Sequence, residues 1–385
     1  SYGITGNQGI SPYGSLARLN TDYTYPIDGE TLSVGAALGD IANADLEWEK
    51  TAQMNVGADM RFFDGRIEFN VDYYDKKTSD LLMRVPLPSA AGGYMRVLRN
   101  VGEVGNKGFE IYLGGSPLNG ELTWETGITF GRNKNEVLAL RGDETSYSLG
   151  DAGVPGFNNS IWLEVGQPMG LFKGYIQNGV WKNAEATEAA KYSTIPGAPK
   201  LVDQNDDGKI NSKDIVPTGN AQPDFSYGWN NRFSYKNFDL NIFVQGVYGN
   251  EILNLSRVRS EITSGDSDAT SIRILDRWTP ENEDTDIPSF TGSKGMKYET
   301  SRWVEDGSYL RIKEISLGYK IPASLLQKLK INSAHIYVSG TNLFTLTNYS
   351  GFDPEASTYV DTWGGIDIAP YPSQKIYTVG LNLKF

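Results

Sequence analysis

The sequence has no cysteine and only one histidine among its 385 residues. A disulfide framework and a zinc site built on thiolates are therefore excluded. The sequence also lacks a run of about 20 apolar residues, the length that a membrane-spanning helix needs, and its mean hydropathy is -0.40. Acidic residues (47) outnumber lysine and arginine (35), and the net charge of -12 argues against nucleic acid as a partner. These absences exclude a disulfide-rich scaffold and a helical membrane protein, and the charge argues against a nucleic-acid-binding protein.

Glycine and aromatic residues are abundant instead. The 43 glycines, 22 tyrosines, 15 phenylalanines and 8 tryptophans favour strands, turns and aromatic belts over helices. The final segment, Lys375–Phe385, alternates without a break from Ile376 onward, so its apolar side chains fall on one face of a strand. These side chains are Tyr377, Val379, Leu381, Leu383 and Phe385. A terminal aromatic residue in this phase is typical of a transmembrane β-barrel, where it lies in the girdle at the membrane edge.

The same alternation recurs along the whole sequence. The pairs Asp64-Gly65, Asn119-Gly120 and Lys236-Asn237 each separate two alternating segments, as the turns of β-hairpins do. A phase slip at Lys313-Glu314 predicts a β-bulge. After a stub at Tyr2–Thr5, the predicted strands are Ala52–Phe62, Arg66–Lys76, Gly108–Leu118, Glu121–Gly131, Asn159–Val165, Leu171–Gln177, Asp224–Tyr235, Phe238–Tyr248, Tyr309–Lys320, Ala334–Phe344 and Lys375–Phe385.

Short and long connections alternate between these strands. The short ones are Asp64-Gly65, Asn119-Gly120, Gly166–Pro168, Lys236-Asn237 and Ile321–Ser333, the last with a helical turn expected at Leu325–Leu329. The long ones are Asn7–Lys50, Thr78–Lys107, Arg132–Asn158, Asn178–Pro223, Gly249–Ser308 and Thr345–Gln374. A bacterial outer-membrane barrel has short turns in the periplasm and long loops outside, so this order places the C-terminus in the periplasm. A soluble β-sandwich or propeller is the alternative, but its loops need not sort by length.

The predicted fold class is therefore all-β, a transmembrane antiparallel β-barrel. The sequence contains about eleven strands and the stub, each near the ~9–11 residues that cross a membrane. A self-contained barrel of about twelve strands and the C-terminal portion of a roughly 22-stranded transporter barrel both fit this number.

Six short segments resemble those of a known family. They are Tyr2-Gly3-Ile4-Thr5-Gly6-Asn7-Gln8; Leu46-Glu47-Trp48-Glu49-Lys50-Thr51 followed by the Asp64-Gly65 hairpin; Asn100-Val101-Gly102 with Asn106-Lys107-Gly108-Phe109-Glu110; Tyr309-Leu310-Arg311-Ile312-Lys313; Thr341-Asn342-Leu343-Phe344; and Gly351-Phe352-Asp353-Pro354-Glu355. In this order, and over nearly all 385 residues, they resemble the C-terminal half of a SusC/RagA-type TonB-dependent outer-membrane transporter.

The resemblance implies import of a nutrient, either a glycan or oligosaccharide or a peptide, across the bacterial outer membrane. It also implies a SusD-like surface lipoprotein that caps the barrel, and TonB as the source of energy. The plug, the TonB box and the first half of the barrel are absent from residues 1–385 and would precede Ser1. No signal peptide opens the sequence, so either it was removed or this is a later piece of a longer protein. Because lipid cannot satisfy open sheet edges, we expect an N-terminal half or a second chain to complete the wall within the outer-membrane lipid.

One motif, in the long connection around residues 178–223, predicts a calcium site. Residues Asp203–Asp214 read D-x-N-x-D-G-x-I-x-x-x-D, the pattern of EF-hand and dockerin calcium loops. The expected ligands are the side chains of Asp203, Asn205, Asp207 and Asp214 and the backbone carbonyl of Lys209, with Asn211 acting through water. Aspartate at the closing position is shorter than the usual glutamate, which weakens bidentate closure. The alternative is an acidic surface loop without metal. We expect a structural calcium ion, bound in an external loop insertion of the barrel.

Two sets of side chains are candidates for contact with a solute. Tryptophans in the long connections could stack on sugar rings or contact the lipoprotein, although large aromatics in loops more often pack the loops together. These are Trp181, Trp278, Trp303 and Trp363. Charged residues in the lumen phase could touch a solute or merely hydrate the wall. These are Arg61, Arg66, Glu68, Asp72 and Glu125.

No catalytic residue is predicted. His335 shares its face with Ser339, but four residues along a strand is about 13 Å, too far for a nucleophile–base hydrogen bond. No G-x-S-x-G elbow surrounds Ser339. We therefore expect a transporter and not an enzyme. The alternatives are a self-contained porin or outer-membrane hydrolase, and a soluble calcium-binding module that adheres to glycans.

Overall fold

The computed structural model describes the chain except for residues 8, 11–12, 18, 27–28, 30–31, 39–40, 87–95, 151–156, 158–159, 263–269, 291–298, 328–330 and 356–363. Strands dominate the described part. Its helices are all too short or too polar to cross a membrane.

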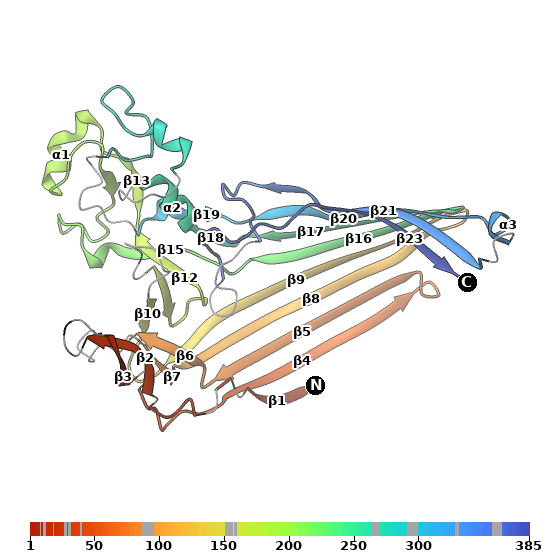
Figure 1. Cartoon of the computed structure of the whole chain (residues 1–385), viewed down its shortest axis with the longest axis horizontal. Coiled ribbons are helices and arrows are strands. Elements are labelled where there is room, and N and C mark those ends of the chain that lie inside the picture. Colours follow the sequence, from red (N-terminus) through yellow and green to blue (C-terminus); the bar gives the residue numbers. More distant parts are fainter. Residues whose placement is uncertain are drawn as a thin grey trace.

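The largest element is a ten-stranded antiparallel sheet, called the wall below (Figure 1). Each strand pairs with the wall strand that follows it in the sequence, so the order is a simple up-and-down one. The strands are β1 (Tyr2–Asn7), β4 (Glu49–Phe62), β5 (Ile67–Ser79), β8 (Gly102–Asn119), β9 (Leu122–Leu140), β16 (Phe225–Tyr235), β17 (Phe238–Tyr248), β20 (Tyr309–Lys320), β21 (Ser333–Thr347) and β23 (Ile376–Lys384). The predicted antiparallel barrel-type sheet is confirmed.

Short turns join the wall strands at one end of the sheet (Figure 1). Between β4 and β5, Asp64 and Gly65 both have positive φ values, 53° and 84°. The Arg66 N–H donates to the Phe63 carbonyl across them at 3.2 Å. This is the type I′ geometry that an Asp-Gly pair predicts. A helical turn lies between β20 and β21 as α3 (Ala323–Leu326), which begins two residues before the expected Leu325; residues 328–329 of the expected turn lie outside the described residues.

Apolar side chains of neighbouring strands lie directly opposite one another across the wall. Val71 of β5 pairs with Ile111 of β8, and Ile111 pairs with Phe130 of β9. Paired residues share a face of the sheet, so the apolar residues form one continuous surface. In β23 and the residue that follows it, the exposed members of this surface are Tyr377, Val379, Leu381, Leu383 and Phe385. The terminal apolar row therefore faces outward, as predicted.

The predicted β-bulge is confirmed in β20. Ile312 pairs with Val244 of β17 and Glu314 pairs with the preceding residue, Phe243, which leaves Lys313 as the extra residue. One extra residue shifts the alternation by one position, and this is the phase slip visible in the sequence.

Two predicted wall strands lie elsewhere, which corrects the expected strand number. Asn159–Val165 and Leu171–Gln177 contribute β11 (Ile161–Glu164) and β12 (Leu171–Tyr175), which belong to a separate four-stranded sheet. Their apolar residues are buried in a protein core and not turned toward lipid: Phe172, for example, is 1% exposed. Gly166–Pro168 is therefore not a wall turn, and in the described part of the chain the wall has ten strands including the stub.

The long connections fold at the opposite end of the wall into a second body, called the loop unit (Figure 1). It contains three small sheets and several short helices. Its elements are β10 (Ser146–Gly150), β11, β12 and β15 (Ile215–Asn220); β13 (Gln177–Val180) and β14 (Pro199–Leu201); β18 (Glu251–Asn254), β19 (Val304–Asp306) and β22 (Ile366–Asp367); α1 (Ala186–Lys191) and α2 (Leu255–Glu261); and the 3-10 turns η1 (Asn183–Glu185), η2 (Ser212–Asp214), η3 (Ile272–Asp276) and η4 (Ser301–Trp303). The hairpins β2 (Leu19–Pro26) with β3 (Leu32–Leu38), and β6 (Leu82–Pro86) with β7 (Arg96–Asn100), lie at the same end. The buried core of the loop unit includes Phe157, Leu163, Phe172, Leu253 and Trp303.

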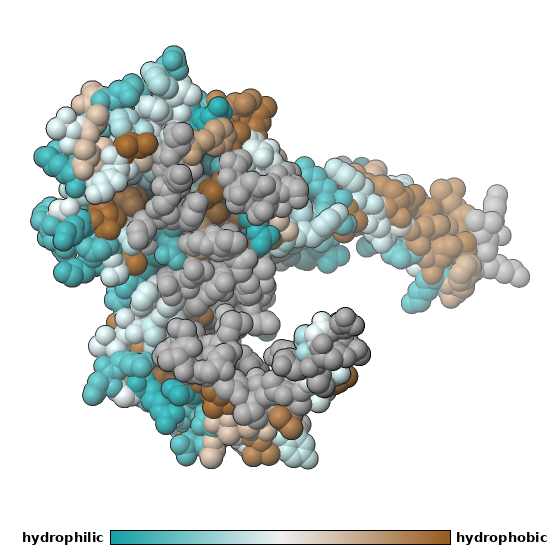
Figure 2. Space-filling model, turned by 60° about the vertical axis from the view of Figure 1, so that its left-hand side comes forward, coloured by the Kyte–Doolittle hydropathy of each residue, from teal (hydrophilic) through white to brown (hydrophobic). Residues whose placement is uncertain are grey.

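Surface hydropathy separates the two bodies. Figure 2 shows hydrophobic residues gathered on the arm of the wall that extends away from the loop unit, whereas the loop unit presents a mostly polar surface. A hydrophobic belt on strands beside a polar cluster of loops is the arrangement that a membrane barrel requires.

Candidate solute-facing wall and calcium-type loop

The face of the wall opposite the apolar surface, called the inner face below, carries polar side chains and glycines. Tyr112 of β8 pairs with Thr129 of β9, and Thr129 pairs with Gly228 of β16. Gly228 in turn pairs with Gln245 of β17. These residues form one polar band across four strands, because paired residues share a face.

Two adjoining hollows of about 540 Å³ each lie on the inner face. Both are lined by Tyr112, Thr129, Gly228 and Phe243. The hollow on the loop-unit side adds Asn70, Asp72, Glu110 and Gln245. The hollow on the turn side adds Glu68, Glu125, Asn230 and Arg232. Carboxylates, amides and hydroxyls of this kind suit a polar solute that can both donate and accept hydrogen bonds.

Three of the five charged residues predicted for the inner face line these hollows. Glu68 and Glu125 lie in the turn-side hollow and Asp72 lies in the loop-side hollow. Arg61 places Nη2 3.4 Å from Oε1 of Glu68, but its side chain is 74% exposed, so the pair contributes little stability. Arg66 lies in the turn between β4 and β5.

His335 has a carboxylate partner and not a serine. Its Nε2 lies 2.8 Å from Oδ1 of Asp239, and its ring stacks on Tyr337 with centroids 6.0 Å apart. Ser339 pairs with residues of the adjacent strands, and within the described residues no serine is hydrogen-bonded to His335. This arrangement favours a polar wall residue over a catalytic base.

The calcium-type loop joins β14 to β15, and its side chains bind its own backbone. Asp203 accepts hydrogen bonds from the N–H groups of Asp207 at 3.3 Å and Gly208 at 2.8 Å. Asn205 accepts from the Asp207 N–H at 3.2 Å, and Asp207 accepts from the Lys209 N–H at 3.1 Å. Gly208 has a φ of 77°, the left-handed conformation that favours glycine at the sharp turn. The first half of the predicted ligand set therefore shares one tight turn.

Asp214, the predicted closing ligand, is fully buried. Its Oδ1 accepts from the Gln204 N–H at 2.9 Å, and its Oδ2 accepts from the Asn211 N–H at 2.8 Å. Each carboxylate oxygen has two lone pairs, so these bonds leave one on each oxygen. In the part of the chain that the structure describes, no group of three or more His, Cys, Asp or Glu side chains stands close enough together to hold a metal ion.

Three of the four predicted tryptophans are buried in the loop unit, and Trp363 lies outside the described residues. Trp181, Trp278 and Trp303 are 4%, 9% and 0% exposed. Trp181 stacks on Tyr192 with ring centroids 6.1 Å apart. Burial of this degree favours the packing role over contact with a solute.

Residues 5–245 match the family model described as TonB dependent receptor-like, beta-barrel. The chain belongs to this family of TonB-dependent receptor barrels. The match covers the wall strands from β4 to β17, so it rests on the same up-and-down sheet that the hairpins predict.

Relatives of this barrel are of the SusC/RagA type. TonB-dependent receptor P3 of Formosa agariphila is 38% identical over 395 residues, which span 100% of this chain and 39% of the relative. TonB-dependent receptor SusC of Bacteroides thetaiotaomicron is 28% identical over 397 residues, which span 100% of this chain and 37% of that protein. A solved structure of the RagAB peptide transporter superposes with a TM-score of 0.81 at 26% identity, over 100% of this chain and 40% of that one. The chain thus spans about two-fifths of the length of these relatives. Family membership confirms that it is not an enzyme.

In an outer-membrane barrel the exposed apolar surface faces lipid, and this gives a first prediction. Val338 is 49% exposed on the apolar surface, and the next residue, Ser339, lies on the inner face. We expect Val338→Arg to destabilise the barrel by about 2–4 kcal/mol, because the charge enters lipid. Ser339→Arg is the matched control, with an effect below about 1 kcal/mol because its charge enters the lumen. Denaturant unfolding in liposomes measures both, and equal effects would contradict the assignment of the two faces.

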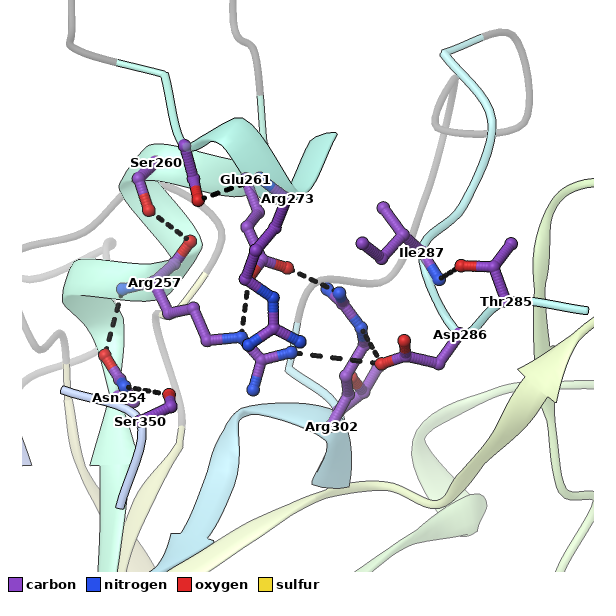
Figure 3. A network of polar contacts seen from close by, with 12 residues as sticks. Asn254, Arg257, Ser260, Glu261, Arg273, Thr285, Asp286, Ile287, Arg302 and Ser350 are labelled. Atoms are coloured by element: carbon purple, nitrogen blue, oxygen red, sulfur yellow. Dashed lines mark hydrogen bonds and ion pairs between the residues drawn. The ribbon is translucent and has the colours of Figure 1, made fainter. Parts of the chain in front are cut away.

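A buried ion cluster in the loop unit of the barrel was not predicted from the sequence (Figure 3). Glu261, at the end of α2, has a side chain that is 1% exposed. Its two oxygens lie 2.6 Å from Nε of Arg257 and 2.5 Å from Nη2 of Arg302. Arg257 also binds Glu305 at 2.8 Å, and Arg302 binds Asp286 at 3.1 Å. Arg257 and Glu261 are four residues apart on α2, but the partners Asp286, Arg302 and Glu305 come from later segments, so no local motif indicates the whole cluster.

A second buried cluster ties a loop to the wall. Arg311 of β20 is 3% exposed and places Nη2 2.5 Å from Oδ1 of Asp353. It also binds Glu355, which further accepts from the Tyr309 hydroxyl at 2.8 Å. Arg311 Nε donates to the Thr345 hydroxyl at 2.8 Å. Both acids belong to the segment Gly351-Phe352-Asp353-Pro354-Glu355, so a segment noted only for its resemblance anchors the loop after β21.

Proposed function

We propose that this chain is the C-terminal wall portion of a transporter that imports a nutrient, an oligosaccharide or a peptide, across the bacterial outer membrane. The observation that carries the proposal is the two-faced wall. Its exposed apolar surface suits lipid, and its inner face offers adjoining hollows lined by hydrogen-bonding groups. The resemblance to SusC and to the RagAB peptide transporter supports import of a large nutrient but does not choose between the two classes.

The proposal includes three protein partners. The wall ends in two unpaired edges, β1 and β23, and the relatives are more than twice as long as this chain. We therefore assign closure of the barrel and the plug to an N-terminal half, and coupling to TonB to that same region. A SusD-like lipoprotein is the proposed cap over the loop unit, in line with the two-component name of the RagAB transporter.

Uptake by living cells tests this function. A strain lacking the full-length gene should fail to take up the nutrient, and the gene should restore uptake. Deletion of TonB, or collapse of the proton gradient, should abolish uptake again. Tagged full-length protein should also co-purify with a lipoprotein. Uptake that persists without TonB would show a passive porin and overturn the proposal.

The long connections are proposed to be extracellular and the C-terminus periplasmic. Residues 1–385 contain no cysteine, so once any cysteine in the rest of the full-length protein is replaced by serine, a single introduced cysteine reports its own side of the membrane. The two labelling variants are Glu188→Cys, at an exposed position of α1 in the loop unit, and Glu121→Cys, in the exposed turn between β8 and β9. On intact cells an impermeant maleimide should label the first and spare the second. The reverse pattern would invert the proposed orientation.

We propose that calcium binds residues 203–214 as a structural ion. The donor set is chemically suitable, because Asp203, Asn205, Asp207 and Asp214 supply hard oxygens and Lys209 supplies a carbonyl. The turn at Gly208 and the free lone pairs of Asp214 are consistent with this set. The loop joins β14 of one small sheet to β15 of another, so a bound ion would fix the two sheets together.

Loss of two ligands should abolish this binding. We expect Asp203→Ala combined with Asp207→Ala to lower calcium affinity by roughly a hundredfold or more, since two of about six oxygen ligands are removed. Asp206→Asn removes one charge from the same loop at a position outside the ligand pattern, and it should bind calcium almost normally. Titration calorimetry with calcium on the full-length protein measures all three. Unchanged affinity in the double variant, or no calcium binding to the parent protein, would contradict the site.

A further inference from the structure

A ribbon of aromatic rings crosses the outer apolar surface of the wall on the side of the loop unit. It spans the four neighbouring strands from β8 to β17, and successive ring centroids lie 5.9 Å, 5.3 Å and 5.1 Å apart. Its members, in order, are Phe109, Phe130, Phe225 and Tyr248. Aromatic girdles lie at both membrane interfaces of an outer-membrane barrel. The ribbon therefore marks the interface on the loop-unit side.

Beyond this ribbon the outward positions of β8 and β9 become charged. Lys107 follows Phe109 two residues closer to the loop unit, and Arg132 and Lys134 follow Phe130 in the same direction. Lys107 and Lys134 are paired directly across the two strands. Like charges in directly opposite positions destabilise a sheet unless an anion neutralises them. Arg132, two positions along β9 on the same face, adds a third cation, and the three form what we call the basic patch.

Carboxylates of the same surface neutralise the basic patch only in part. Nζ of Lys107 lies 3.1 Å from Oδ2 of Asp75, and Nζ of Lys134 lies 2.7 Å from Oε2 of Glu136. Both lysine side chains are more than half exposed, at 58% and 75%, so these pairs are weak and open to exchange. Arg132 is exposed, and among the described residues no carboxylate pairs with its guanidinium group. The basic patch therefore has one unpaired cation and two that can turn to another anion.

The lipid beside the wall is the source of anions at this place. β8 and β9 are paired on both sides with other wall strands, and the open edges β1 and β23 lie elsewhere in the sheet. A second half of the barrel joins those edges and leaves the outer surface of β8 and β9 facing lipid. Lipid phosphates lie at the interface, and basic side chains there attract them. Arginine can bind one phosphate through two parallel N–H groups, which gives the unpaired Arg132 a suitable partner.

We propose that the basic patch binds the phosphate of an anionic lipid in the outer leaflet of the membrane. Arg132 is the central contact, Lys107 and Lys134 add charge, and the acyl chains of the lipid lie along the aromatic ribbon. The site is on the lipid side of the wall, so it goes beyond the proposed import function. Only the choice of leaflet rests on the proposed orientation, in which the loop unit is extracellular.

Lipid binding to the purified full-length protein in detergent micelles tests the site, with native mass spectrometry as the measurement. The probes are lipid A, which is a phosphorylated glycolipid of the outer leaflet, the same lipid with its phosphates removed, and inorganic phosphate as a competitor. The parent protein should bind lipid A about tenfold or more tightly than the dephosphorylated lipid. Arg132→Gln combined with Lys134→Gln should weaken the binding of lipid A roughly thirtyfold, because two cations beside the phosphate are lost.

Arg61→Gln combined with Lys236→Gln is the matched control. It removes the same charge, but Arg61 points to the inner face beside Glu68, and Lys236 lies in the short turn between β16 and β17. The control should bind lipid A as the parent does, and heat-modifiable migration on gels confirms folding of every variant. Equal binding of the two lipids, displacement of lipid A by an equal concentration of inorganic phosphate, or equal effects of the two double variants would overturn the site. Lipid A binding together with an inverted maleimide pattern would refute the orientation and leave the phosphate site intact.

Discussion

Glu261→Ala is expected to destabilise the loop unit by about 3–5 kcal/mol, a typical loss when one partner of a buried ion pair is removed. Glu261 neutralises the guanidinium groups of Arg257 and Arg302, and Nε of Arg273 lies 3.4 Å from its Oε1. The side chains of Arg257 and Arg302 are nearly buried, at 12% and 5% exposed, so neither can recover its hydration in the folded protein. The variant leaves Arg257 with Glu305 and Arg302 with Asp286, so the cluster keeps two carboxylates for the guanidinium groups of Arg257, Arg273 and Arg302.

The position of the cluster explains why the effect spreads beyond α2. The guanidinium carbons of Arg257 and Arg302 lie 5.4 Å and 4.4 Å from the ring centroid of Trp303, a fully buried member of the loop-unit core. Arg257 also bonds Glu305 of β19, so the cluster links the helix to the sheet β18-β19-β22. Misplaced arginines would therefore disturb the packing of the core as well as its charge balance.

Hydrogen exchange at the amides of α2 in the full-length protein measures the predicted loss of protection. Glu188→Ala is the control, because Glu188 is an exposed glutamate of α1 whose ion pair with Lys191 is screened by solvent and contributes little stability. A Glu261→Ala variant as stable as Glu188→Ala would contradict the assigned role.

The strands of the wall could be predicted from the sequence because the polarity pattern that defines each strand involves only neighbouring residues. A strand between lipid and water alternates in polarity residue by residue, and one inserted residue shifts the phase, as at Lys313. The turn at Asp64-Gly65 is equally local, because two left-handed residues in succession set its type. Register within a hairpin then follows from its turn, whereas the pairing of successive hairpins, such as β9 with β16, spans a long connection and follows only from the up-and-down order.

The loop unit could not be predicted in the same way, because its contacts are long-range. β11 and β12 are short apolar runs, and alternation alone does not distinguish a buried strand from one that faces lipid. Glu261 and Arg302 are 41 residues apart, and nothing in either neighbourhood identifies the other as its partner. The tryptophans show the same limit. The sequence places Trp303 in a long connection, but in the structure its side chain lies in the core of the loop unit.

Arg311→Met is expected to release the loop after β21 from the wall, with a loss of about 3–5 kcal/mol in local stability. The substitution keeps the apolar stem of the side chain but removes its charge-assisted bonds to Asp353 and Glu355. Asp353 is 3% exposed and becomes a buried carboxylate without a cation. Lys313 lies 3.2 Å from Glu355 and compensates only that second acid.

The pH dependence of this stability should reverse its sign in the variant. Burial raises the pKa of Asp353, but hydrogen bonds from Arg311, Ser373 and the Glu355 N–H outweigh it and lower the pKa to about 2 from its ordinary 3.8. A pKa that is lower in the folded state contributes stability above the unfolded value, and that contribution, about 2 kcal/mol, is lost as pH falls from 3.8 through 2. Without Arg311 burial dominates, the pKa of Asp353 rises, and the variant should gain stability on acidification because the neutral acid is the form that tolerates burial.

Hydrogen exchange at the Glu355 and Ser373 amides reports this local equilibrium, because both N–H groups donate to Asp353, at 3.0 Å and 2.8 Å. Arg61→Met is the matched control: it also removes an arginine from a wall strand, but one that is 74% exposed, so its effect should stay below about 1 kcal/mol. Asp353→Asn should remove the pH dependence in either background. A parallel loss of protection in Arg311→Met and in the parent protein between pH 4 and 2 would contradict the coupling between Arg311 and Asp353. The loop would then be held by Glu355 with its partners Tyr309 and Lys313.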